Sequence, residues 1–156
     1  MQLEVHASRV IGAPTEKVFD FAVASENLPR ILKVFGPIPG ITSIEMLDGA
    51  TLATGARRRV RMSDGSEIFE EVTALDRPRR HSYRWLNAPA PPFSLLVRRG
   101  EADWIFTASA QGTRIEWTYR FELTSPLAAP LAAVVMMLFK RWMQRGLERI
   151  TPFVSG

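Results

Sequence analysis

His81 has the side chain best suited to acid–base chemistry in this chain, which contains two histidines. Its alternating register with Tyr83 and Trp85 places the three side chains on one face of a predicted strand. A histidine on an apolar face could act as a general acid or base near neutral pH. The neighbouring Arg79 and Arg80 favour the alternative, a solvated or hydrogen-bonded histidine at a strand end. The sequence leaves both interpretations open and makes His81 the single catalytic candidate.

Arg58 is the second polar candidate, because it shares a predicted inward face with Val60. A buried guanidinium needs a carboxylate partner or an anionic ligand. Glu70 shares the face of Ile68 on the next predicted strand and could supply that carboxylate. We therefore expect a structural ion pair between Arg58 and Glu70. An unpaired Arg58 could instead hold the carboxylate of a ligand.

Other kinds of chemistry are excluded by what the sequence lacks. It contains no cysteine, which rules out a disulfide, a zinc–thiolate site and a thiol nucleophile. It has no Gly-rich phosphate-binding loop, no serine nucleophile elbow and no His-x-x-x-His pair. With two histidines, a metal site would need carboxylates from unrelated positions. We predict no metal ion and no cofactor.

The elements that position these residues are mainly strands. Apolar and polar residues alternate over much of the chain, and segments rich in Gly, Pro and Asp separate the alternating stretches. With 156 residues, 46% of them hydrophobic, the chain has the size and composition of one globular domain. The predicted order is a strand at 3–11, two short helices starting at 15 and 26, six strands at 41–47, 56–62, 67–75, 81–86, 101–109 and 113–123, and a long helix at 125–150.

The long C-terminal helix changes character along its length. From residue 140 onward it is amphipathic, whereas residues 127–139 are apolar on every side. A helix that is apolar all round needs cover all round, and we expect the sheet on one side and the apolar loop 93–97 on another. The stripe predicted to face the sheet consists of Leu131, Val134, Val135, Leu138, Phe139, Trp142, Met143, Gly146, Leu147 and Ile150.

Short motifs follow one another in a recognisable order along the whole chain. They are Ala13-Pro14-x-Glu16-x-Val18-Phe19, Gly55-Ala56-Arg57, Asp76-x-Pro78 followed by Tyr83-Arg84-Trp85, and Gly112-Thr113-Arg114-Ile115-Glu116-Trp117. In this order the chain resembles the START-like superfamily (SRPBCC), the polyketide cyclase/dehydrase and lipid-transport family with the birch-pollen-allergen fold. The resemblance implies an α+β helix-grip fold: a seven-stranded curved antiparallel sheet wrapped around the long C-terminal helix, with two short helices after the first strand. It would form a single domain over residues 1–156.

The resemblance also implies an internal cavity between the sheet and the last helix, suited to lipids, polyketides or other apolar molecules. Aromatic residues at alternate strand positions fit such a lining, although they would also fill a solid core. The predicted lining consists of Arg58, Val60, Met62, Glu70, His81, Tyr83, Trp85, Trp104, Trp117, Tyr119, Phe121, Val135, Leu138 and Trp142.

Two functions remain open at this point. The first is a carrier or sensor that binds a small hydrophobic ligand, such as a lipid, a polyketide-like compound or an aromatic molecule. The alternative is a cyclase or dehydratase that acts on an apolar carbonyl compound, with His81 or a carboxylate moving protons. The family has no universal catalytic triad, so the resemblance does not choose between them.

The charge distribution bears on partners and location. The net charge is +4, with 17 arginines and three lysines spread over many segments, which argues against a nucleic-acid partner. We see no secretory signal pattern, and the apolar stretch 127–139 is short for a membrane span and contains Pro130. We therefore expect a cytoplasmic protein. The same stretch and the loop 93–97 are compatible with transient contact with a membrane surface, and a homodimer is a further expectation.

Overall fold

The computed structural model describes residues 1–155 and contains an antiparallel sheet of seven strands. The strands are β1 (Gln2–Ile11), β2 (Ile41–Met46), β3 (Arg57–Met62), β4 (Glu67–Asp76), β5 (Arg80–Trp85), β6 (Val97–Ser109) and β7 (Gly112–Leu123). Their order in the sheet is β1-β7-β6-β5-β4-β3-β2. The strands from β2 to β7 therefore pair with their neighbours in sequence, and β1 joins the sheet beside the last strand.

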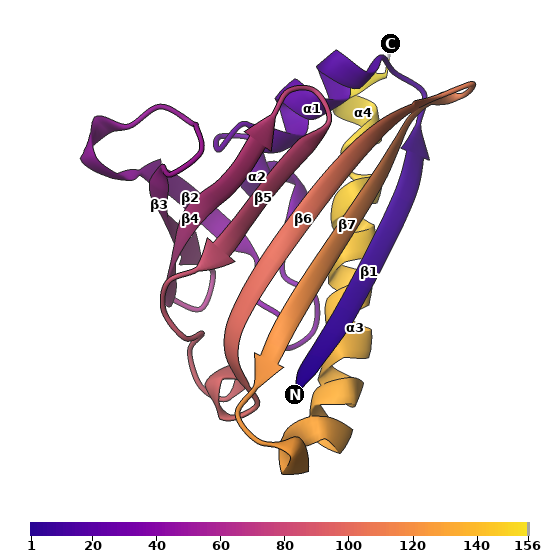
Figure 1. Cartoon of the computed structure of the whole chain (residues 1–156). Coiled ribbons are helices and arrows are strands. Elements are labelled where there is room, and N and C mark those ends of the chain that lie inside the picture. The colour runs from indigo at the N-terminus through magenta and orange to yellow at the C-terminus, as the bar shows by residue number, and fades with distance from the viewer. Residues whose placement is uncertain (156) are drawn as a thin grey trace.

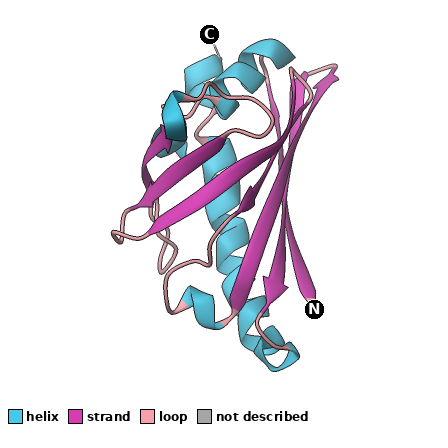
Figure 2. Ribbon diagram, turned by 60° about the vertical axis from the view of Figure 1, so that its left-hand side comes forward, coloured by secondary structure: helices cyan, strands magenta, loops and turns pink. Residues whose placement is uncertain are grey.

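The sheet curves around the long helix α3 (Ala129–Glu148), as Figures 1 and 2 show. This helix lies on the concave face, where it packs against β1 and β7. The helices α1 (Thr15–Val23), α2 (Leu28–Ile31) and α4 (Thr151–Val154) gather near the end of α3 that is closer to the C-terminus. Short 3-10 turns occur at η1 (Leu47–Gly49), η2 (Phe93–Leu95) and η3 (Pro126–Ala128). The predicted α+β helix-grip fold is confirmed.

The alternation read from the sequence determines which side of the sheet faces α3. On β7 the side chains of Ile115, Trp117, Tyr119 and Phe121 are at most 4% exposed, and they belong to one continuous apolar core. Successive side chains on a strand point to opposite faces, so the polar residues between them lie on the convex side. The inner face of β7 therefore supplies much of the aromatic wall of the interior.

The hairpin between β6 and β7 depends on Gly112. Its φ of +128° lies in a region that residues with a Cβ rarely adopt, and a Cβ there would stand 2.1 Å from the carbonyl oxygen of Ile11. The glycine thus allows the hairpin end to contact the end of β1. Thr113, the next residue, donates a hydrogen bond from its hydroxyl to the carbonyl oxygen of Ala13 at 2.8 Å. These contacts hold β1 against β7.

The arginines on the convex face of the sheet are paired with carboxylates. Arg61 bonds to Glu67 at 3.2 Å, and Arg84 bonds to Glu71 at 2.9 Å. The ion pairs of Asp103 with Arg80 and Arg120 continue the same pattern, as does the pair of Arg120 with Glu101. Exposed pairs of this kind contribute little stability each, on the order of 0–1 kcal/mol. Their main effect is to neutralise a face that would otherwise be strongly basic.

The structure corrects the prediction for the first half of the long helix. Leu131 and Val134 were expected to face the sheet, but they are 60% and 57% exposed. Ala132, Met136 and Phe139 are the residues buried in this half. Because residues 127–139 are apolar on every side, their periodicity could not define a buried face. The expected cover is present only in part, since Phe93 packs on Phe139 with ring centroids 6.2 Å apart.

Strand boundaries differ from the prediction by more than one residue at one place. β6 begins at Val97, four residues before the expected start at 101. Val97 is fully buried, and it pairs with Leu123 at the end of β7. The proline-rich run before it made this stretch resemble a loop, whereas pairing with β7 extends the strand.

Candidate functional site: a polar cluster in the wall of a small cavity

A small cavity lies between the inner face of the sheet, α3 and the short N-terminal helices. The space open to the centre of a water molecule is about 20 Å³, which is room for roughly one ordered water. One wall is the sheet, from which Arg58, Glu70, His81, Tyr83, Trp104 and Tyr119 contribute. The other walls are formed by Ala22, Leu28, Leu32, Trp142 and, from the edge strand β2, Ile41 and Ile44. The cavity is thus polar on the strand side and apolar elsewhere.

Arg58 and Glu70 form the expected ion pair across β3 and β4. The Arg58 Nε donates to Glu70 Oε1 at 2.9 Å, and the two side chains are 1% and 7% exposed. The guanidinium also lies over the Tyr83 ring, 4.9 Å from its centroid, where the ring face attracts a cation. Burial raises the pKa of the Glu70 carboxyl, and the adjacent Arg58 opposes this rise. The Nη1 of Arg58 is buried and has no hydrogen-bond partner among the described residues.

His81 is buried beside this pair, so the interpretation as a solvated strand-end histidine is wrong. Its residue exposure is 2%, and neither ring nitrogen has a hydrogen-bond partner within residues 1–155. Burial, together with the nearby positive charge of Arg58, lowers the His81 pKa to about 3. The imidazole is therefore neutral at pH 7, with one nitrogen able to donate and the other able to accept. The exposed Arg79 and Arg80 made this position resemble a solvated strand end, but alternation turns His81 to the face opposite Arg80, and Arg79 lies in the turn before β5.

Two tyrosine hydroxyls complete the polar wall. The hydroxyls of Tyr83 and Tyr119 lie 3.1 Å apart, and the Trp104 indole donates to the Tyr83 hydroxyl at 3.4 Å. Burial and the neighbouring Glu70 raise the pKa of Tyr83 to about 12. Burial and the neighbouring Tyr83 raise the pKa of Tyr119 as well. Both phenols therefore stay protonated at neutral pH.

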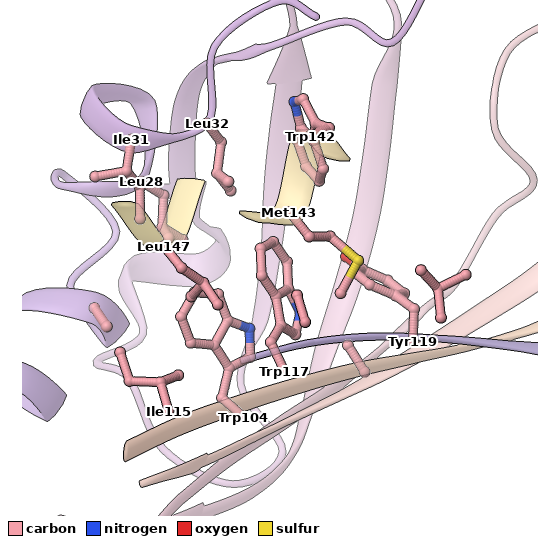
Figure 3. Close-up of a cluster of buried hydrophobic side chains, with 14 of the residues drawn as sticks. Leu28, Ile31, Leu32, Trp104, Ile115, Trp117, Tyr119, Trp142, Met143 and Leu147 are labelled. Carbon is pink, nitrogen blue, oxygen red and sulfur yellow. The ribbon is translucent and has the colours of Figure 1, made fainter. Parts of the chain in front are cut away.

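Trp142 faces this wall from α3. Figure 3 shows its ring across from Trp104, Trp117 and Tyr119, with Leu28 and Leu32 on the side of α2. Its indole Nε1 is buried without a hydrogen-bond partner in the part of the chain that the structure describes. Trp142 packs on Trp117 with ring centroids 5.9 Å apart. Trp142 thus joins Arg58 and His81 as a cavity-lining residue that carries an unpartnered donor.

The remaining residues of the predicted lining lie outside the cavity wall. Trp85 and Phe121 join Phe93 and Phe139 in an aromatic cluster, with Phe121 and Phe139 centroids 5.1 Å apart. This cluster fills the interior next to the cavity. Trp117 is buried and stacks on Trp104. Val135 and Leu138 are half-buried against the apolar core, whereas on β3 Val60 is buried and Met62 is half-buried.

The sequence prediction missed the apolar wall formed by α1, α2 and β2. Ala22, Leu28, Leu32, Ile41 and Ile44 are spread over short elements whose pattern does not show which side faces the sheet. Leu28 and Leu32 stand four residues apart, which was the available signal for a shared helix face. Gly146 on α3 brings this wall close, because a Cβ there would lie 2.6 Å from Leu32 Cδ2.

The chemistry available in the cavity is dominated by unused hydrogen-bond donors. Arg58 Nη1 and Trp142 Nε1 can only donate, and His81 offers one donor and one acceptor. Buried donors without partners cost on the order of 1–3 kcal/mol each, which a bound oxygen atom would relieve. The residues described here include no cluster of three or more metal-ligating side chains. The site is therefore suited to an uncharged, oxygen-bearing group.

The chain matches a known protein family over almost its whole length. Residues 2–152 match the sequence model of the family described as polyketide cyclase / dehydrase and lipid transport. Comparison with curated proteins finds no match.

Solved structures share the fold over nearly the whole chain. Ara h 8.0201 is 19% identical, with a TM-score of 0.76, covering 99% of this chain and 98% of its own. TTHA0849 from Thermus thermophilus is 26% identical, with a TM-score of 0.72 and 97% coverage of both chains. The di-domain ARO/CYC BexL from the BE-7585A biosynthetic pathway is 16% identical, with a TM-score of 0.71, covering 99% of this chain and 50% of its own.

Proposed function

Because the chain belongs to the polyketide cyclase / dehydrase and lipid transport family, we propose that it binds a small hydrophobic molecule between the sheet and α3, as a carrier or sensor. The observation that carries this proposal is the cluster of buried, unpartnered donors in an otherwise apolar interior. The three residues that carry these donors, Arg58, Trp142 and His81, line the same cavity. An apolar lining with a few convergent polar groups is the usual composition of a small-molecule site.

The donors define the kind of ligand. A carbonyl or hydroxyl oxygen would accept from the guanidinium, the indole or the imidazole and remove the cost of leaving them unpaired. The rest of the ligand would be an apolar or aromatic body that packs against Leu28, Leu32 and the tryptophans. Lipids, polyketide-like compounds and aromatic ketones or phenols all meet this description.

Ligand entry requires the cavity to open. A site for a ligand of ordinary drug size has a volume of roughly 300–1,000 Å³, far above the space present in this closed form. The wall best able to move is β2, because it is an edge strand of the sheet and pairs with β3 alone. Its residues Ile41 and Ile44 line the cavity and are only half-buried. We propose that outward movement of β2 and α2 admits the ligand.

A cyclase or dehydratase activity is the second candidate, and the position of His81 in the cavity wall favours it. An acid–base catalyst works best when its pKa lies near the operating pH. The His81 pKa of about 3 makes the imidazole a weak base, and the raised pKa of Tyr83 makes that phenol a weak acid. These directions support binding over proton transfer in the closed form. Incubation with a poly-β-ketone, monitored for the mass loss of water, tests the activity. Turnover that is lost in His81→Ala while binding persists would establish the enzyme.

Binding can be tested with three naphthalene compounds of similar size. Naphthalene, 2-naphthol and 2-acetonaphthone differ in whether they carry an oxygen acceptor. We expect the two oxygenated compounds to bind more tightly by about 3–10-fold, the value of one neutral hydrogen bond. Trp142→Phe should reduce that preference and leave the affinity for naphthalene nearly unchanged. Trp117→Phe is the matched control, since the Trp117 indole is also buried without a hydrogen-bond partner among residues 1–155 but lies outside the cavity wall.

Calorimetric titration measures these affinities, and the rise in melting temperature provides an independent readout. Failure of all three compounds and of a broad lipid panel to bind would refute the proposal. Equal affinities of the three compounds would refute the role assigned to the donors.

A further inference from the structure

Five exposed apolar side chains form one patch at the end of the molecule where α3 begins. Leu95, Leu127, Leu131, Val134 and Met137 are 71%, 91%, 60%, 57% and 63% exposed, respectively. We call this patch the apolar tip. An isolated exposed leucine is ordinary, but a contiguous exposed patch of this kind marks a contact surface.

The five residues are contiguous because of helix spacing and one tertiary contact. Leu127, Leu131, Val134 and Met137 follow one another at intervals of four, three and three residues, which places them on one side of η3 and α3. The Thr124 hydroxyl donates to the carbonyl oxygen of Leu95 at 2.8 Å, which ties η2 to the segment just before η3. Figure 1 shows the loop before β6 and the start of α3 together at the lower end.

The helix that carries the tip is apolar over much of its length. The segment Pro126–Val154 contains an 18-residue window with a mean hydropathy of 1.3, of which 28% is buried. The second half of α3 is committed to the core through Trp142, Met143 and Leu147, so the helix does not leave the fold. The apolar surface remaining for contact is the outer side of the first half, about 15 Å long from Leu127 to Met137.

The charges around the tip indicate which partner it fits. No acidic residue occurs between Glu122 and Glu148 in the sequence. Lys140 and Arg141, exposed and one turn beyond Met137, form no ion pair with any of residues 1–155. A second copy of the chain would bring the same cations to the interface, whereas anionic lipid headgroups would neutralise them.

We propose that the apolar tip docks on an anionic lipid bilayer. Leu95, Leu127, Leu131 and Val134 enter the boundary between headgroups and acyl chains, and Lys140 and Arg141 bind the headgroups. Interfacial helices of this composition bury their apolar side about 5–10 Å deep, which the exposed side of α3 can supply without unfolding. The ligand cavity takes no part in this contact, so a failure of ligand binding would leave the docking proposal unaffected.

Vesicle flotation of the full chain tests the apolar component. We expect the protein to float with vesicles of phosphatidylcholine containing about 30% phosphatidylserine, and much less with phosphatidylcholine alone. Val134→Gln should weaken binding about 10-fold. Val34→Gln is the matched control, because Val34 is 58% exposed and Val134 is 57% exposed. Both substitutions lie on the surface, so the melting temperatures should stay close to that of the original protein.

The charge component has its own variant pair. Lys140→Gln/Arg141→Gln should weaken binding to anionic vesicles about 10-fold or more, whereas Arg9→Gln/Lys17→Gln, with the same change in net charge, should weaken it far less. Equal losses in the two double variants would overturn the proposal, as would equal binding by Val134→Gln and Val34→Gln. The proposal also fails if the protein does not float with anionic vesicles. A dimer in light scattering that Val134→Gln dissociates would then show that a second copy covers the tip.

Discussion

Acidification should destabilise this fold through the buried imidazole of His81. The His81 pKa falls from 6.5 to about 3 in the folded protein, because burial and Arg58 disfavour the charged ring. Between these two values the unfolded chain binds a proton that the folded protein excludes. The resulting contribution to stability is fully present above pH 6.5 and is lost as the pH falls toward 3.

The size of the effect follows from the two pKa values. At pH 5 the unfolded chain gains about 2 kcal/mol relative to the folded protein from protonating this one histidine. At pH 4 the same linkage reaches about 3 kcal/mol, a large share of the typical stability of a domain. Carboxylates such as Asp103 add to acid sensitivity. Although burial opposes it, hydrogen bonds from Ser82, Arg120 and Arg80 lower the Asp103 pKa to about 2.

Urea unfolding at pH 8 and pH 5 separates His81 from the carboxylates. His81→Phe should shrink the stability difference between the two pH values by about 2 kcal/mol, while all other titrating groups remain the same. His81→Gln provides a second neutral side chain in case the phenylalanine packs poorly. His6→Gln is the control, because the other histidine is exposed and bonds to Thr118. An unchanged stability difference in both His81 variants would refute the reasoning.

Three further predictions concern stability and packing. Arg58→Met should lower the free energy of unfolding in urea by about 3–5 kcal/mol, because it leaves Glu70 buried and unpaired. The double variant Arg58→Met/Glu70→Leu should recover much of that loss. A double variant as unstable as the single one would contradict this. Gly100→Ala should cost about 1–3 kcal/mol, because its Cβ would stand 2.9 Å from the Trp85 ring; an unchanged melting temperature would show that the ring moves freely. Phe93→Ala should lower the free energy of unfolding by about 2 kcal/mol and leave a cavity beside Phe121 and Phe139 that binds xenon. A variant that binds no xenon would show that Phe93 does not fill this space.

The fold was predictable because its signals are local and repeated. Alternation on β7 indicated that Trp117 and Tyr119 point inward, and the turn at Gln111-Gly112 fixed the hairpin. Arg58 and Glu70 were predicted to pair from alternation alone, since neighbouring antiparallel strands place facing residues side by side. The expectations of a cytoplasmic location, a single domain over residues 1–156, the absence of a nucleic-acid partner and a homodimer remain predictions.

The candidate site was less predictable because it depends on contacts between distant segments. Whether His81 was buried depended on the position of α3 and of Arg58, and no local pattern reports either. The outer side of α3 was unpredictable for a different reason. Residues 127–139 are apolar all round, so the choice between Leu131 and Ala132 as the buried side chain was made by packing against β1 and not by periodicity.

The central claim is that a ligand oxygen meets the unpartnered donors inside the cavity. The most direct measurement is the ¹H–¹⁵N spectrum of the four tryptophan indoles during titration with 2-naphthol, with Trp142→Phe assigning its signal. We predict that the Trp142 indole proton shifts strongly as it gains an acceptor, while the signal of Trp85 moves little. Saturable binding that leaves the Trp142 and Trp104 indole signals in place would put the ligand elsewhere and contradict the account.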